Sequence, residues 1–144
     1  MATSAVPAFL TALRSALIAR PGLTGVGVFT APPGDELPPE ALVVDRVVST
    51  QAWAALGRQK REEGFTVFLV AHAAKPGTGE AIFAELRDRC FALAAEVENA
   101  LRDDVSVAGT VRVAQFARGE LRQGAGTQGR WAQIEMQIDA AQRI

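Results

Sequence analysis

The sequence predicts an α+β fold, in which a mainly antiparallel sheet carries one long helix and one N-terminal helix packed on one face. Two apolar, β-branched runs, Ala41–Val48 and Phe65–Ala74, are separated by a charged segment, Gly57–Gly64. A long amphipathic segment follows, and the chain closes on residues that alternate between apolar and polar. Strand runs that adjoin in sequence favour antiparallel pairing over a parallel, doubly wound sheet.

Length and composition are those of a single domain. The chain has 144 residues, of which 49% are hydrophobic, so it can bury one core of ordinary size. We therefore expect residues 1–144 to form one domain. The formal net charge of −1 predicts no general attraction to nucleic acid or to an anionic membrane. The first residues show neither a basic leader nor a long apolar block, so we expect no signal peptide and no membrane span.

The N-terminal elements are a helix, a short strand and a loop. Apolar residues recur at three- and four-residue steps, which predicts a helix over Ser4–Arg20 with its first serine as the cap. A Pro-Gly pair ends that helix, and a short strand is expected over Leu23–Thr30. Four prolines within Ala31–Pro39 then predict a loop, because proline cannot donate to a strand ladder.

The two long apolar runs are expected to form a hairpin. Phe65–Ala74 is apolar on both alternating faces, which is typical of a central strand covered on both sides. The charged segment between the runs carries basic and acidic residues in similar number, so we expect an exposed hairpin tip. Both signs of charge on such a tip suit contact with a neighbouring subunit better than contact with nucleic acid.

The second helix has the clearest pattern. Its apolar stripe is formed by Ile82, Leu86, Leu93, Val97 and Leu101. This spacing predicts a helix over Gly79–Arg102 that lies on the sheet. Two ion pairs are expected on its other face, Glu85 with Arg89 and Glu98 with Arg102, because each pair is four residues apart.

Alternation with a period of two returns after this helix. One predicted strand has a shared apolar side formed by Val105, Val107, Val111 and Val113. A glycine-rich turn is expected over Gly119–Gly129. The closing strand has a dry face formed by Ile134, Met136 and Ile138. Its wet face is formed by Gln133, Glu135, Gln137 and Asp139.

No recognisable reaction centre is present in the sequence. His72 is the single histidine and Cys90 the single cysteine, so one chain lacks the residues for a catalytic triad, a two-histidine metal site or a thiolate cluster. Lys75–Glu80 follows a strand and opens a helix, but Glu80 stands where a phosphate-binding loop needs a lysine. We therefore predict no catalytic residues, no metal and no cofactor.

Several segments together carry a family resemblance. They are the N-terminal helix, the Pro-Gly entry into the first strand, the stretch RQKREEGFTVFLVAHAAKPG, the long helix and the closing IEMQIDAAQRI. In order and polarity these segments resemble the tail terminator and neck (head-tail joining) proteins of long-tailed bacteriophages and phage-like particles. The likeness spans about Phe9–Ile144 and departs from some members at the proline-rich loop Ala31–Pro39.

The resemblance implies a virion protein that is not an enzyme. It implies a ring, commonly a hexamer, that caps the tail tube in the tail or neck, meets the head connector and is assembled in the cytoplasm of a bacterial host. DNA would pass through the lumen of the ring without specific binding, and no membrane is involved. The charged tip is the expected subunit interface, with Arg58, Lys60, Arg61, Glu62 and Glu63. The wet face of the closing strand has no lysine to hold a polyanion, which suits a lumen lined by Gln133, Glu135, Gln137 and Asp139. Contact of this face with bulk water is the alternative.

Two other functions remain compatible with these residues. The first is a small-molecule-binding or enzymatic α+β domain with a pocket between the long helix and the sheet. The second is a baseplate or tube adaptor of a contractile injection particle, which would use the same surfaces in a different ring. A measurement of molecular size separates the first alternative from a ring-forming protein.

Overall fold

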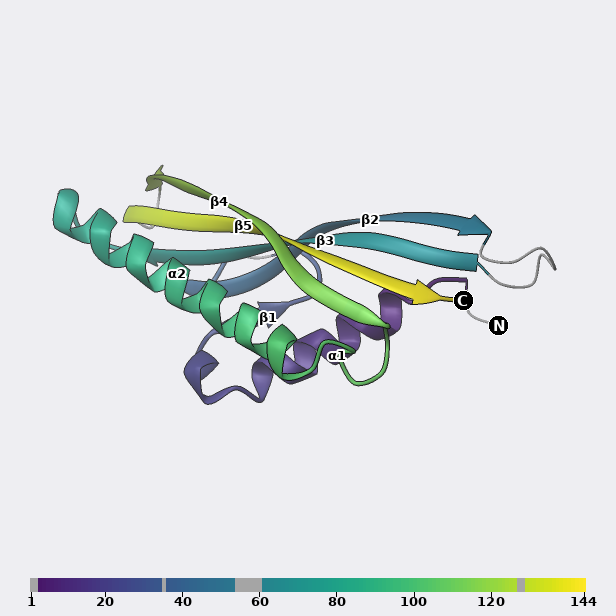
Figure 1. The fold of residues 1–144 in the computed structure, drawn as a ribbon. Coiled ribbons are helices and arrows are strands. Elements are labelled where there is room, and N and C mark those ends of the chain that lie inside the picture. The colour runs from purple at the N-terminus through teal and green to yellow at the C-terminus, as the bar shows by residue number, and fades with distance from the viewer. Residues whose placement is uncertain (1–2, 35, 54–60, 127–128) are drawn as a thin grey trace.

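A five-stranded sheet is covered on one face by two helices (Figure 1). The structure is a computed structural model that describes residues 3–34, 36–53, 61–126 and 129–144. Its helices and strands are α1 Val6–Ile18, the 3₁₀ turn Pro21–Leu23, β1 Gly27–Phe29, β2 Glu40–Trp53, β3 Arg61–Lys75, α2 Glu80–Asp103, β4 Val113–Gly126 and β5 Gly129–Arg143. The predicted α+β class, with both helices on the same face, is confirmed.

The strands lie in the order β1-β2-β3-β5-β4. The four long strands pair antiparallel, whereas the short β1 pairs parallel with β2. β3 is central, as predicted, but helices cover only one of its faces. On the other face Phe68 is nevertheless buried, and the guanidinium of Arg46 from β2 lies 3.9 Å from the centre of its ring. Neighbouring side chains therefore bury part of that face of β3, while Thr66 and Val70 remain half-buried.

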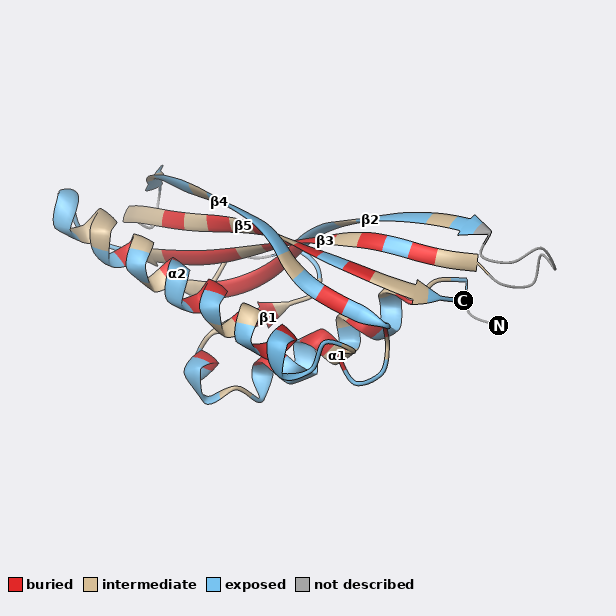
Figure 2. Ribbon diagram, in the orientation of Figure 1, coloured by how far each residue is buried: buried red, intermediate tan, exposed pale blue. Residues whose placement is uncertain are grey.

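The core lies between the sheet and the helices (Figure 2). The three predicted dry positions of β5 are buried and face α2: Ile134, Met136 and Ile138. Phe9 of α1 meets Phe65 of β3 edge to face, with ring centroids 5.2 Å apart. The alternation of β5 and the stripe of α2 thus identified the core correctly. Neither helix of the described residues is long and apolar enough to cross a bilayer.

The ion pairs of α2 differ in part from expectation. Glu98 and Arg102 pair within the helix at 2.7 Å, as predicted. Arg89 instead binds Glu40 at the start of β2, and Glu85 binds Lys75 at 2.8 Å. These two residues lie on the side of α2 that meets the ends of the hairpin strands, so partners from the sheet replace the intrahelical pair.

The segment after α2 is a turn and not the predicted strand. The carboxylate of Asp104 accepts hydrogen bonds from the backbone N–H groups of Ser106 and Ala108, which curls the chain back on itself. Val107 then adopts a positive φ of 45° and is buried, while Val105 remains exposed. The local side chain to backbone hydrogen bonds therefore prevail over the alternation of the valines.

The glycine-rich segment predicted as a turn is instead the second half of β4. Gly119 to Gly126 pair in register with β5. A Cβ atom on Gly124 would lie 2.6 Å from the Trp131 ring, and one on Gly119 would lie 3.3 Å from Phe116. At least two of these glycines therefore give neighbouring aromatic rings room to pack, and their presence does not break the strand.

Candidate functional site: the open face of the sheet and the charged hairpin

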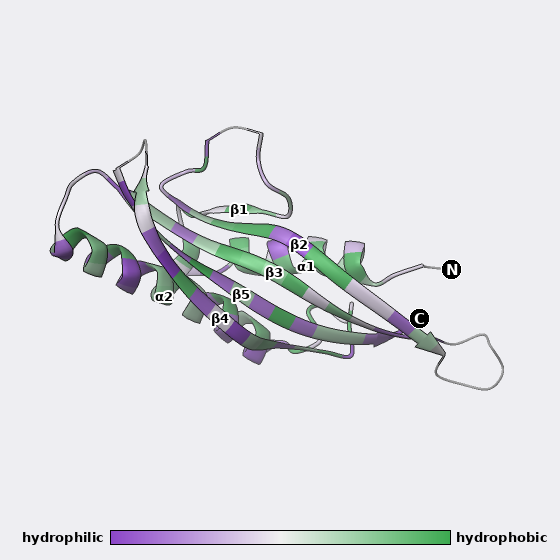
Figure 3. Cartoon of the chain, turned by 90° about the horizontal axis from the view of Figure 1, so that it is seen from above, coloured by the Kyte–Doolittle hydropathy of each residue, from purple (hydrophilic) through white to green (hydrophobic). Residues whose placement is uncertain are grey.

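The face of the sheet opposite the helices is open (Figure 3). The wet residues of β5 lie on this face, because the alternate residues between them are buried against α2. They form one row, flanked by β3 and β4: Gln133, Glu135, Gln137 and Asp139. The structure therefore brings all four predicted lumen residues together. That they face a lumen stays a prediction.

Side-chain hydrogen bonds to β3 hold two residues of this row. Asp139 accepts a hydrogen bond from the hydroxyl of Thr66 at 2.7 Å. At the other end of the row, the amide nitrogen of Gln133 lies 3.0 Å from Nδ1 of His72. These contacts fix where the polar groups of the row point, so the open face presents an ordered polar surface.

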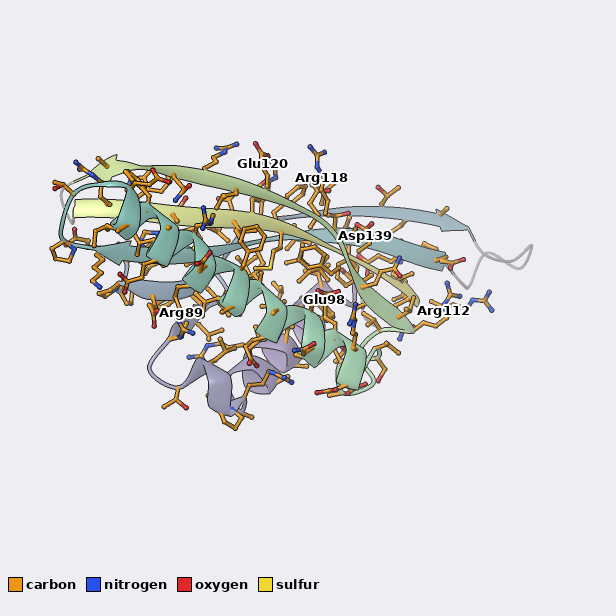
Figure 4. All side chains as sticks on the ribbon, turned by 60° about the vertical axis from the view of Figure 1, so that its left-hand side comes forward. Arg89, Glu98, Arg112, Arg118, Glu120 and Asp139 are labelled. Atoms are coloured by element: carbon orange, nitrogen blue, oxygen red, sulfur yellow. The ribbon has the colours of Figure 1, made fainter. Side chains whose placement is uncertain are left out.

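The open face also carries arginines that the sequence analysis missed. β4 presents Arg118, Glu120 and Arg122 at alternate positions of this face, and Figure 4 shows the first two projecting away from α2. Nε of Arg122 lies 3.7 Å from the carboxylate of Glu120. With Arg46 of β2 over Phe68, the face has both signs of charge. The row on β5 has no lysine, but the open face as a whole does contain cations, some of which have partners within the sheet.

His72 is a buried neutral residue on this same face. It is 6% exposed, and burial lowers the pKa of its imidazole. If the amide of Gln133 donates to Nδ1, the proton of the ring is on Nε2, which has no hydrogen-bond partner among the described residues. The imidazole is hydrogen-bonded to one side chain and enclosed, which is the geometry of a structural histidine.

The single thiol is also buried. Cys90 is fully buried on the side of α2 that faces the sheet, with Sγ 3.1 Å from the carbonyl oxygen of Ala132, and burial raises its pKa to about 11. Such a thiol is protonated at neutral pH and is a poor nucleophile. Within the part of the chain that the structure describes, no three His, Cys, Asp or Glu side chains are grouped so as to hold a metal ion.

The structure divides the charged hairpin. Arg58 and Lys60 lie outside the described residues. Arg61 opens β3, and its backbone N–H and carbonyl pair with those of Ile144. Glu62 is bound by Arg112 at 2.6 Å in an exposed ion pair. The predicted tip is thus shorter than expected, because its last residues belong to the strand.

Glu63 corrects one member of the predicted subunit interface. Its side chain is fully buried, and its carboxylate accepts hydrogen bonds from the hydroxyl of Ser4, the N–H of Ala5 and the hydroxyl of Ser49. Burial alone would raise the pKa of Glu63, but these hydrogen bonds lower it below its ordinary value. Glu63 is occupied within its own chain and is not available to a neighbouring subunit.

A groove of about 400 Å³ lies between α2 and β4. Phe91 of α2 borders it and is 54% exposed, while Phe116 and Leu121 of β4 form its floor. Glu98 and Glu120 stand at its rim. The groove is open to solvent along the edge of the sheet. The sequence did not predict it, because the glycines of β4 favour a turn over Gly119–Gly129.

Comparison with solved structures gives a likeness of fold. No model of a known protein family and no curated protein matches the sequence. Among solved structures, a chain of a structure titled "Virion of native gene transfer agent (GTA) particle" aligns with a TM-score of 0.64. The chain shares its fold with a virion component. The alignment covers 97% of this chain and 99% of that one at 17% sequence identity, so the likeness concerns the whole fold.

Proposed function

We propose that the protein is a non-enzymatic structural component of a phage-like virion. The observation that carries this proposal is the likeness of fold to a chain from a gene transfer agent virion, over nearly the full length of both chains. The order of charged and apolar segments in the sequence supports the same class independently. The protein would thus act through surfaces that bind other virion proteins.

Within such a particle, we assign the protein to the ring that caps the tail tube and joins it to the head connector. In the family that the sequence resembles, this ring is commonly a hexamer. Its partners are copies of itself, the tail tube protein below and the neck proteins above. Four residues of the charged hairpin remain proposed subunit contacts: Arg58, Lys60, Arg61 and Glu62.

The open face of the sheet is the surface that we place toward the DNA. Both helices lie on the other face, and the row from Gln133 to Asp139 presents polar groups along a length of β5. A conduit must allow the DNA to pass, so a strong net positive charge would be unfavourable there. The arginines of this face meet that condition in part, because Arg122 is near Glu120 and Arg46 covers an aromatic ring.

The small-molecule alternative would need an enclosed pocket between α2 and the sheet. In the structure this space is filled by buried side chains, among them Leu86, Leu93 and Val97 of α2. The groove beside Phe91 lies along the edge of the sheet and is open to solvent. An adaptor ring of a contractile injection particle would use the same surfaces as the proposed ring and differs in the tube that it binds.

Light scattering tests the proposal. The purified chain, alone and mixed with tail tubes, should give a species several times heavier than the 15.2 kDa protomer. Some ring proteins assemble only on their partner, so the mixture is the decisive sample. A chain that stays monomeric both alone and with tubes would contradict the proposed function and favour the small-molecule alternative.

A further inference from the structure

Within the part of the chain that the structure describes, no strand pairs with the outer side of two segments of the sheet. β1 pairs only with Ala41–Val43 of β2, and beyond this point β2 continues as an edge over Val44–Ala52. At the opposite edge, the start of β4 is covered, since the N–H of Ala114 donates to the carbonyl of Val105 at 2.8 Å. No backbone hydrogen bond from another described segment reaches the outer side of Phe116–Gly126. Each edge therefore exposes backbone groups that another strand can satisfy.

The directions of the strands make these two edges compatible. Each neighbouring pair in the series β2, β3, β5, β4 is antiparallel, so β2 and β4 run in opposite directions. A second copy in the same orientation would therefore place its β2 antiparallel to β4 of the first. No copy has to be inverted, and the contact is head to tail, which is the kind that builds a ring.

The position of the two free segments also fixes an offset between copies. Across the sheet, Val48 lies in one row with Thr66, Asp139 and Gln115. Leu121, at the centre of the free segment of β4, pairs with Ile134, which lies five residues from Asp139 along β5. At ~3.3 Å per residue this offset is roughly 16 Å, and four strands spaced ~4.8 Å apart span roughly 19 Å. This offset therefore tilts the strands by about 40°, within the ~35–45° that closed barrels require.

Exposed apolar side chains mark both flanks of the sheet. On the β4 flank, Phe91 stands beside the groove lined by Phe116 and Leu121. On the β2 flank, Val48 is 54% exposed in the middle of the free segment. Ile18 of α1 is 52% exposed. It lies one turn after Arg14, whose Nε donates a hydrogen bond to the carbonyl oxygen of Val28 in β1. A contact that joins the two flanks would bury these side chains.

We propose that each copy adds the free segment of its β2, Val44–Ala52, to the free segment of β4, Phe116–Gly126, in the next copy. The inference rests on the proposed ring and names the surfaces that build it. The added strand satisfies backbone groups of both edges and brings the α1 side of one copy over the α2–β4 groove of the other. Repetition of this contact extends one antiparallel sheet around the assembly.

Disulfide trapping tests this pairing. Residues facing each other on antiparallel strands have Cα atoms about 4.5–5.5 Å apart, within the ~4.4–6.8 Å that a disulfide needs. Val48→Cys and Glu120→Cys place thiols on the open face of the two segments, and Arg118→Cys and Arg122→Cys sample the adjacent registers. Under mild oxidation, an equal mixture of the β2 variant with one β4 variant should give a covalent dimer. The chain that carries both substitutions should give a ladder of larger species.

Single variants and a distant position serve as controls. Val48→Cys alone should not cross-link, because a head-to-tail contact never brings two identical positions together. Val48→Cys mixed with Asp88→Cys, on the exposed side of α2, should also stay unlinked. Oligomers that form without a cross-link at any of the three registers would overturn the pairing and leave the ring intact. Cross-linked chains that form only open filaments would support the pairing and contradict the ring.

Discussion

The carboxylate of Glu63 lies 2.6 Å from the hydroxyl of Ser4, 59 residues away in the sequence, and so ties the start of α1 to β3. The same carboxylate accepts the N–H of Ala5, the residue before the first turn of the helix. The hydroxyl of Ser4 accepts the N–H of Val6 at 3.1 Å, whereas Ala5, at the N-cap position, has no side chain that can cap the helix. A negative charge next to the N-terminus of a helix is favourable, so Glu63 acts as a cap supplied from the sheet.

Replacing Glu63 by Gln should therefore destabilise the fold. The neutral amide lacks the negative charge that strengthens the hydrogen bonds from Ser4, Ala5 and Ser49, and this loss costs about 1–3 kcal/mol of unfolding free energy. Urea denaturation measures this loss. The matched control is Glu62→Gln at the neighbouring exposed position, for which the change should stay within about 0.5 kcal/mol. Equal effects of the two substitutions would show that the buried carboxylate is not a cap.

The same contact predicts an acid sensitivity. The pKa of Glu63 is lowered in the folded protein, so the unfolded chain takes up the proton first as the pH falls. Stability is therefore complete above the unfolded pKa of about 4.3 and is lost as the pH falls toward the lower folded value. The difference in unfolding free energy between the parent and Glu63→Gln should shrink over this range. A constant difference would argue against a charged carboxylate at this position.

His72 predicts a second loss of stability on acidification, which begins at a higher pH than the loss caused by Glu63. Its pKa is lowered by burial, so protonation favours the unfolded chain once the pH falls below about 6.5. The melting temperature of the parent should therefore fall as the pH is lowered from about 6.5 to about 5, which is above the pH range in which Glu63 acts. The variant His72→Gln should lack this part of the pH dependence. If it keeps the full slope, other groups are responsible.

The closing strand offers a pair of adjacent positions with opposite environments. Ile138 is fully buried, so Ile138→Asp should cost several kcal/mol, out of a total stability of roughly 5–15 kcal/mol, because it places a carboxylate in the core. Gln137→Lys, on the open face, should fold normally. Circular dichroism and urea titration of both variants check the assignment of the two faces. A stable Ile138→Asp protein would contradict it.

Lysine substitutions test the orientation of the open face in the ring. Gln133→Lys combined with Gln137→Lys adds two cations per subunit to the row on β5. If this row lines the lumen, the assembled double variant should retain DNA at low salt and release it at moderate salt, because each phosphate contact releases counterions. The parent ring should retain little DNA under both conditions. Equally low retention by both rings would remove β5 from the lumen and would leave the core assignment unchanged.

Regular alternation and periodicity were the parts of this fold that the sequence predicted well. The stripe of α2 and the two faces of β5 follow directly from spacing, because burial on one side imposes a period on the residues. The role of Glu63 could not be predicted in this way, since its donors come from Ser4 and Ser49 at distant positions. Sequence spacing does not show which carboxylate a remote helix end will bind.

Most of β4 could not be predicted from the sequence, and the surfaces that β4 helps to form were therefore not predicted either. Its glycines favoured a turn, yet in the fold Gly124 lies against the ring of Trp131 and the strand pairs along its full length. The available signal was the alternation of Arg118, Glu120 and Arg122. The glycines outweighed this signal, so the arginines of the open face and the groove beside Phe91 are known from the structure and not from the sequence.

Electron microscopy of tail tubes incubated with the purified protein tests the central claim most directly. Tubes of the same particle should carry a ring of this protein at one end, and a histogram of tube ends should show capped ends only when the protein is present. The control uses tubes without the protein. Bare tube ends, together with a chain that remains monomeric in the supernatant, would contradict a function in closing the tail.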